Sequence, residues 1–267
     1  MNIGVFYQSA DKLVACYKAL EQLRTIYPDI PVVLYEDGSN ILSSVANKFN
    51  CKYIWIEKQG ENSPTCGRVF VKKNGQLEWL KRINYACETH LKNCDWILHY
   101  EDDVWCKQLI TKYPKFDMSG ANGPLYNPQL YQFLKDRFNI MDESRCHWSL
   151  LGSLQSYCGC GGAIFNREKF IYIYKNIDQI PWEIIYQLDT KPIEWCDATL
   201  SFVFQYFGFT NGKWDDWGHY DHKNIGNWWD KTGWSVPMSE QPNVAFLHAY
   251  KHYYVYKNDE LDMVKSS

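Results

Sequence analysis

The chain has 267 residues, of which 46% are apolar, and a formal net charge of -3. A chain of this length can bury a core of native size, and α/β folds of this length often form one domain. The 28 basic and 31 acidic residues nearly balance, which excludes the broad positive field that nucleic acids and anionic membranes require. We therefore expect neither as a partner.

No run approaches the roughly 20 apolar residues that a membrane-spanning helix needs. The N-terminal stretch MNIGVFYQSADK lacks the basic start and the cleavage pattern of a signal peptide. We expect a soluble, cytoplasmic protein without a transmembrane segment, in which the ten cysteines are mostly buried thiols.

Apolar runs alternate with helical spacing along the first hundred residues. The pattern predicts strands over 3–8, 31–35, 52–58 and 95–100, helices over 11–24, 43–50 and 77–92, and a loop over 59–75. Strands that alternate with helices favour a mostly parallel central sheet flanked by helices.

The second part of the chain is less regular. Helices are predicted over 128–138, 167–176 and 196–207, a glycine-rich turn over 158–165, and a strand over 243–254. Residues 211–243 are rich in Trp, Asp, Gly and Asn without any period, and they are interpreted as a long aromatic loop.

Two predicted strands end in acidic residues, at Glu36-Asp37 and at 101–103. In a parallel sheet both ends lie at the same edge, where ligands bind. Carboxylates that follow a buried strand repel one another unless a counter-charge is near. Glu101 and Asp103 point to one face of an extended chain, which suits Mg²⁺ or Mn²⁺. The alternative is a solvated loop that caps a helix or pairs with Lys107.

Three motifs together resemble the nucleotide-sugar-dependent glycosyltransferases of the GT-A fold, of the family-2, DxD-containing type. YEDGSN at 35–40 resembles the DDGS motif, KRIN at 81–84 resembles the basic segment before the metal strand, and EDD at 101–103 resembles the DxD motif. Glu101 departs from the usual Asp, and Asn40 and Ile41 depart from Ser-x-Asp. The resemblance implies a GT-A-like, Rossmann-like α/β fold.

The resemblance also implies a metal site. Asp103 would bind Mn²⁺ or Mg²⁺ directly, Glu101 would bind it through water or hold the ribose, and His248 would be a third ligand. A histidine after an apolar strand is equally often a core residue, so that alternative stays open.

The resemblance further implies a nucleotide site. Its expected members are Tyr7 and Gln8 beside the base, Asp37 on the base or ribose, Arg82 or Lys81 on the diphosphate, Asp102 within the triplet, and Lys251 on a phosphate. A basic residue on an amphipathic helix is more often part of a solvated face.

The catalytic base is sought among three carboxylates. Asp197 is the first candidate and Glu194 the second, because inverting enzymes of this fold carry an acidic pair in this region. Asp216, in WDDW at 214–217, is the third, by its resemblance to a motif of some N-acetylglucosaminyltransferases. Asp197 has an alternative role as a helix N-cap.

We therefore expect a metal-dependent, inverting hexosyl- or pentosyltransferase that uses a UDP- or GDP-sugar and a glycan or other hydroxyl acceptor. The predicted single domain comprises a nucleotide-sugar half at 1–105, an aromatic acceptor half at 106–255 and a polar tail at 256–267. Residues 211–234 are expected to close over the cleft as a lid. The alternatives are a non-catalytic carbohydrate- or nucleotide-binding module and a metal-dependent phosphohydrolase or nucleotidyltransferase.

Overall fold

The structure is a computed structural model of the chain. It describes residues 1–9, 12–38, 40–57, 75–102, 104–124, 128–145, 148–188, 196–219, 229–230, 233–234 and 243–248.

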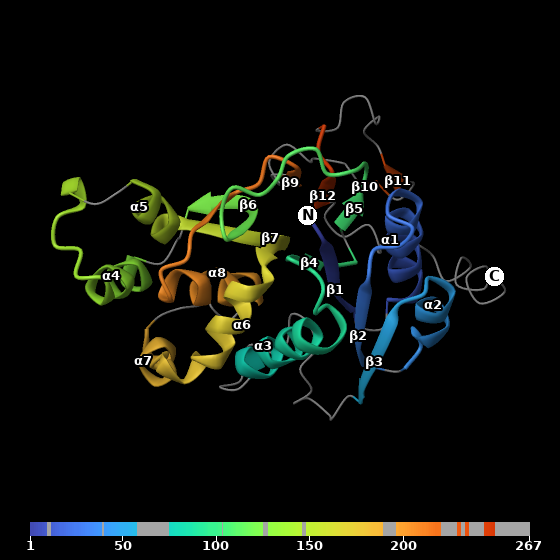
Figure 1. Cartoon of the computed structure of the whole chain (residues 1–267), viewed down its shortest axis with the longest axis horizontal. Coiled ribbons are helices and arrows are strands. Elements are labelled where there is room, and N and C mark those ends of the chain that lie inside the picture. Colours follow the sequence, from blue (N-terminus) through green and yellow to red (C-terminus); the bar gives the residue numbers. More distant parts are fainter. Residues whose placement is uncertain are drawn as a thin grey trace.

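A seven-stranded sheet forms the centre of the molecule, in the order β3-β2-β1-β4-β7-β6-β8 (Figure 1). Its strands are β1 (Ile3–Ser9), β2 (Val32–Gly38), β3 (Lys52–Glu57), β4 (Trp96–Tyr100), β6 (Met118–Pro124), β7 (Ser156–Asn166) and β8 (Asn211–Lys213). Pairing is parallel except where β7 meets β4 and β6. The predicted mostly parallel α/β sheet is confirmed.

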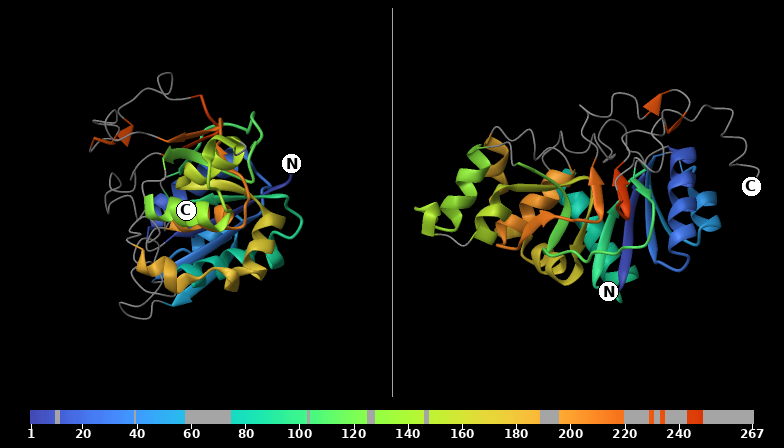
Figure 2. Two further views of the ribbon diagram at one scale, coloured as in Figure 1. Left: turned by 90° about the vertical axis from the view of Figure 1, so that its left-hand side faces the viewer. Right: turned by 90° about the horizontal axis from the view of Figure 1, so that it is seen from above.

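Smaller elements complete the described fold. The helices are α1 (Leu13–Ile26), α2 (Ser43–Lys48), α3 (Gly75–Tyr85) with the π-helical turn η3 (Ala86–His90), α4 (Pro128–Arg137), η4 (Glu143–Arg145), α5 (Trp148–Gln155), α6 (Arg167–Lys175), η5 (Ile177–Gln179), α7 (Trp182–Gln187) and α8 (Cys196–Tyr206). A three-stranded sheet contains β5 (Val104–Cys106), β12 (Phe246–His248) and β9 (Trp217–His219), and β10 (Trp229–Asp230) pairs with β11 (Gly233–Trp234). Figure 2 shows an elongated molecule, with α4 and α5 at the end opposite α1 and α2.

Alternate residues of the strands enter two cores, one on each face of the sheet. Val5 and Tyr7 of β1 belong to a cluster with residues of α1 and α2, whereas Phe6 belongs to a cluster with residues of α3, α6 and α8. A parallel sheet needs cover on both faces. This requirement explains why its strands are continuous apolar runs in the sequence.

The sequence predicted a glycine-rich turn over 158–165. This prediction is wrong, because the segment lies within strand β7. Gly162 has a φ of 134°, and a Cβ there would lie 2.5 Å from the carbonyl oxygen of His99 and 2.9 Å from the ring of Trp217. Glycine is therefore needed where β7 approaches β4 and an indole ring closely.

The prediction of a long aromatic loop over 211–243 is also partly wrong. Residues 211–213 and 217–219 form β8 and β9, and Trp214 and Trp217 are buried, with exposures of 1% and 3%. The two indoles stack on each other, and both contact the ring of Phe246. They belong to a core and not to a lid, because apolar rings of this size gain most free energy when they are removed from water.

Some predictions fall partly or wholly outside the described residues: the loop over 59–75, the last strand beyond residue 248 and the tail over 256–267. In the part of the chain that the structure describes, no helix is both long and apolar enough to cross a bilayer. Six of the described cysteines are free thiols, and burial raises the pKa of each of them.

Candidate functional site

Three parallel strands end at the same edge of the sheet, and each delivers polar residues there. β1 pairs in parallel with both β2 and β4, so their carboxyl ends are adjacent. These ends carry Gln8, the pair Glu36-Asp37 and the triplet 101–103. The prediction that the acidic strand ends share one side of the sheet is confirmed.

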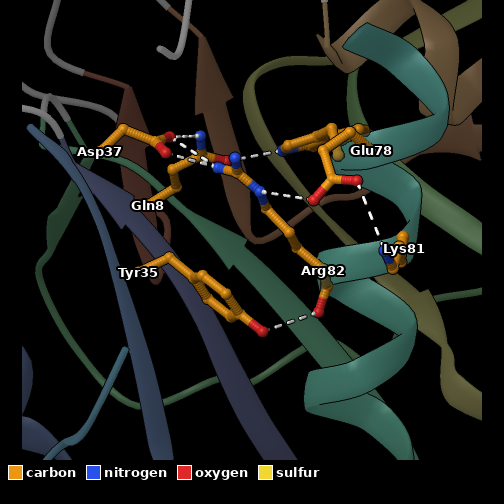
Figure 3. Close-up of polar contacts among 7 residues, drawn as sticks. Gln8, Tyr35, Asp37, Glu78, Lys81 and Arg82 are labelled. Atoms are coloured by element: carbon orange, nitrogen blue, oxygen red, sulfur yellow. Dashed lines mark hydrogen bonds and ion pairs between the residues drawn. The ribbon is translucent and has the colours of Figure 1, made fainter. Parts of the chain in front are cut away.

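Asp37, at the end of β2, forms a buried ion pair with Arg82 of α3 (Figure 3). Nη1 of Arg82 donates to the two carboxylate oxygens at 2.6 and 2.8 Å, and Nε2 of Gln8 donates to one of them at 2.7 Å. Gln8 in turn accepts a hydrogen bond of 2.7 Å from the indole of Trp79. None of these four side chains is exposed by more than 3%.

The network joins β1 and β2 to α3. Burial raises the pKa of Asp37, and the guanidinium of Arg82 and the amide of Gln8 offset part of that rise. The sequence predicted Gln8, Asp37 and Arg82 as contacts of a nucleotide sugar. The structure brings the three together but directs their polar groups at one another, and the contact with a nucleotide stays a prediction.

Glu36 shapes the turn that follows β2. Its carboxylate accepts hydrogen bonds of 2.9 Å from the backbone N–H groups of Ile41 and Leu42, and another from the hydroxyl of Tyr53. Sequence reasoning grouped Glu36 with the ligand-binding edge. The signal for its structural role is a carboxylate a few residues before a turn, where backbone N–H groups lack partners.

Asp102, the middle residue of the triplet, is held from two sides. The hydroxyl of Tyr7 donates to its Oδ1 at 2.6 Å, and Nζ of Lys12 lies 3.4 Å from its Oδ2. Burial and the carboxylate of Asp102 raise the pKa of the Tyr7 phenol well above its usual range. Tyr7 is fully buried, so it supports Asp102 in the structure, and its predicted place beside the base stays a prediction.

Glu101 is the more accessible acid of the described pair. Its side chain is 21% exposed and lies 3.5 Å from Nε2 of His99, which is fully buried. The His99 ring packs against Phe6 and Trp79. The Trp79 indole therefore touches both the Asp37 network and the residue beside Glu101, which links the two acidic strand ends.

His248, the last residue of β12, lies opposite the residue that follows the acidic triplet in the chain. In the three-stranded sheet, His248 pairs with Val104, the residue that directly follows the triplet. Its exposure is 6%. Strand β12 thus brings a residue from near the end of the chain to the end of β4, which the sequence predicted through the resemblance alone.

A divalent metal ion would find oxygen and imidazole donors here, the ligand types that suit Mn²⁺ or Mg²⁺. Among the described residues, however, no group of three or more His, Cys, Asp or Glu side chains is arranged to hold a metal ion. Asp103, the predicted direct ligand, lies outside the described residues. The donor chemistry fits a metal, and the ligand set stays a prediction.

Asp216, the third candidate base, makes structural contacts, and its role as a base stays a prediction. Its buried carboxylate accepts hydrogen bonds of 2.5 Å from the backbone N–H groups of Thr111 and Lys112, and others from the Thr111 hydroxyl. It fixes the segment between β5 and β6 to the strand β9.

The remaining predicted residues are less completely placed. Asp197 is the second residue of α8, at the N-terminal end of the helix, where a capping residue or a negative charge is favoured. Its side chain is outside the described part of the chain. Glu194 and Lys251 are outside it altogether. Lys81 is 66% exposed and lies 3.7 Å from Glu78, as expected of a solvated face.

Sequence reasoning missed Lys12 and Trp79. Lys12 directly precedes the first turn of α1. It lay within the first turn of the helix predicted over 11–24, and a cation at that position, just after a strand end, was a signal that could have been used. Trp79 lies in the amphipathic pattern of 77–92 and gave no separate signal.

No family model matches this chain, and no curated protein matches it. Among solved structures, the crystal structure of galactosyltransferase LgtC in complex with donor and acceptor sugar analogues is similar, with a TM-score of 0.51. The match covers 98% of this chain and 95% of that chain at 10% sequence identity. A likeness at this identity shows the fold and does not by itself carry the function. The chain therefore shares the α/β fold of that galactosyltransferase, which agrees with the GT-A-like fold that the sequence predicted.

Proposed function

We propose that this protein is a metal-dependent glycosyltransferase that moves a sugar from a UDP- or GDP-sugar to a hydroxyl of a glycan or another acceptor. The observation that carries the proposal is the position of the triplet 101–103. It follows the central parallel strand β4 at the ligand-binding edge, in a fold shared with a galactosyltransferase.

The metal would be held by Glu101, Asp103 and His248. Bound there, Mn²⁺ or Mg²⁺ would stabilise the negative charge of the leaving diphosphate. The register of His248 beside Val104 supports this set, because it brings an imidazole to the strand that starts where the triplet ends.

The proposed reaction inverts the anomeric configuration. A carboxylate takes the proton of the acceptor hydroxyl, the acceptor oxygen forms a bond with the anomeric carbon, and the bond to the nucleoside diphosphate breaks. Asp197 is the first candidate for this base and Glu194 the second. The start of α8 at Cys196 puts Asp197 at a helix N-terminus. This position supports Asp197 as the base, because a helix N-terminus favours the ionised carboxylate that can accept a proton.

A panel of nucleotide sugars, each with and without Mn²⁺, tests the donor by thermal shift, since a ligand that binds only the folded state raises its stability. We expect a UDP- or GDP-sugar to raise the melting temperature, and more so with Mn²⁺. Asp103→Asn should remove the Mn²⁺-dependent part, whereas Asp29→Asn, exposed near the amino end of β2, should not.

Product analysis then separates the candidate functions. Transfer releases the intact nucleoside diphosphate, whereas a phosphohydrolase or nucleotidyltransferase releases phosphate or pyrophosphate. Donor binding without turnover in the presence of a broad acceptor panel would favour a binding module. A product with the donor's anomeric configuration would reject the inverting mechanism and Asp197 as its base.

A further inference from the structure

The middle residue of the acidic triplet connects a lysine to the proposed donor site. Asp102 has a side chain only 4% exposed, and the side chain of its partner Lys12 is 36% exposed. The Tyr7 hydroxyl holds the other carboxylate oxygen at 2.6 Å. One end of the Lys12–Asp102 pair is thus fixed in the core, and the other reaches the surface at the ligand-binding edge.

The local backbone adds positive potential at Lys12. Lys12 is the N-cap residue of α1, whose 14 residues run away from the carboxyl end of β1. The first turn of α1 contains no acidic residue, and the Lys12 side chain does not cap the helix. A helix N-terminus attracts anions, so the dipole and the ammonium group act in the same direction.

The ammonium group of Lys12 is the partly exposed end of the pair. Lys12 follows the carboxyl end of β1, the edge at which such sheets bind ligands. A phosphate group at this edge would therefore meet a positive charge. Lysine is a common ligand of phosphate, to which it presents a point charge.

We infer that Lys12 binds the diphosphate of the donor and that Asp102, held by Tyr7, positions it. This inference rests on the proposed function. It also gives the residues of the triplet two different roles. Asp102 positions Lys12, while Glu101 and Asp103 stay available to bind the metal. The sequence-based assignment of Asp102 as a direct nucleotide contact is replaced by a positioning role.

The test is calorimetric titration of UDP and GDP into the full chain, with and without Mn²⁺, at low and high ionic strength. Lys12→Met should weaken the binding of the preferred diphosphate about ten-fold, as expected for the loss of one charge-assisted contact. The affinity of the variant should also depend less on salt, because one screened attraction is gone. Lys12→Arg keeps the charge and should retain most of the affinity.

Lys18→Met is the matched control, because Lys18 belongs to the same helix and pairs with Glu21 at 3.5 Å. It should leave both the affinity and its salt dependence unchanged. Circular dichroism of each variant checks that the fold is retained. A merely structural role of Lys12 would change the melting temperature without changing the salt dependence of binding.

Two outcomes overturn the inference and are distinguishable. If the wild-type chain binds UDP or GDP and Lys12→Met binds it equally well, Lys12 is not a diphosphate contact, and the proposed function is unaffected. If the wild-type chain binds no nucleoside diphosphate and no nucleotide sugar, the proposed function fails and the inference fails with it.

Discussion

The Asp37–Arg82 pair shows how one buried residue depends on another. Both charges lie in the core, with exposures of 0% and 3%. Removing charges from water has an unfavourable free energy. In such pairs the attraction and the hydrogen bonds offset it only while both partners are present. The Gln8 amide adds a further donor to Asp37. The resemblance predicts a nucleotide contact for Asp37, whereas the contacts in the structure predict a structural effect.

Asp37→Ala should therefore lower the free energy of unfolding by about 3–5 kcal/mol, because it leaves Arg82 as a buried, uncompensated charge. Urea denaturation measures this change. The double variant Asp37→Ala/Arg82→Met should lose less than the sum of the single variants, since no charge is then stranded.

Lys81→Met on the exposed face of the same helix is the control and should change stability by less than about 0.5 kcal/mol. If Asp37→Ala kept its stability but lost affinity for UDP or GDP, the carboxylate would be a nucleotide contact after all.

At the scale of the element, strand β7 depends on the absence of a side chain. β7 is antiparallel to both β4 and β6, and Gly162 lies where β7 passes the end of β4. Its φ of 134° is one that residues with a Cβ rarely adopt, and the carbonyl oxygen of His99 occupies the space that a Cβ would need. The same close approach packs the ring of Trp217 against this strand.

Gly162→Ala should destabilise the protein by about 1–3 kcal/mol or more, from backbone strain and steric overlap. Gly152→Ala in α5 is a control with the opposite sign. A Cβ at position 152 meets nothing within 4 Å, so alanine should stabilise the helix by about 0.5–1 kcal/mol. Thermal denaturation of both variants measures the difference, and equal melting temperatures would contradict the geometry.

At the scale of the whole molecule, the two predicted halves share their structure. The central sheet combines β1 to β4 from residues 1–105 with β6 to β8 from residues 106–255. The small sheet joins β5 to strands that lie more than a hundred residues later in the chain. Because hydrogen-bond ladders cross between the halves, neither half has a complete sheet or core of its own.

The chain should accordingly unfold in one cooperative transition. Tryptophan fluorescence, which reports on residues such as Trp79 and Trp214 in different cores, and far-ultraviolet circular dichroism should give the same urea midpoint. Two separated midpoints would show that the nucleotide-sugar half and the acceptor half fold as independent domains.

The predictions from sequence were most accurate where contacts are local. In residues 1–100, the described strands and helices occur where the hydrophobic periodicity predicted them. A helix here buries one apolar face and a central strand buries both, and each arrangement leaves its own spacing of apolar residues in the sequence. In the second part, β8 and β9 escaped prediction because they are three residues long and owe their conformation to distant partners. The glycines in β7 and the tryptophan in β9 gave turn and loop signals for the same reason.

By itself, the sequence determined the α/β alternation, the parallel sheet and the edge at which acidic residues gather, since periodicity and strand direction are local properties that residue types encode. Only the tertiary structure decided what each polar group touches. It showed Asp37 paired with Arg82, Asp216 saturated by backbone donors, Asp102 held between Tyr7 and Lys12, and His248 brought beside Val104. These partners are 45 to 144 residues apart in the chain, and no local pattern encodes such a distance, because packing of the whole chain sets it.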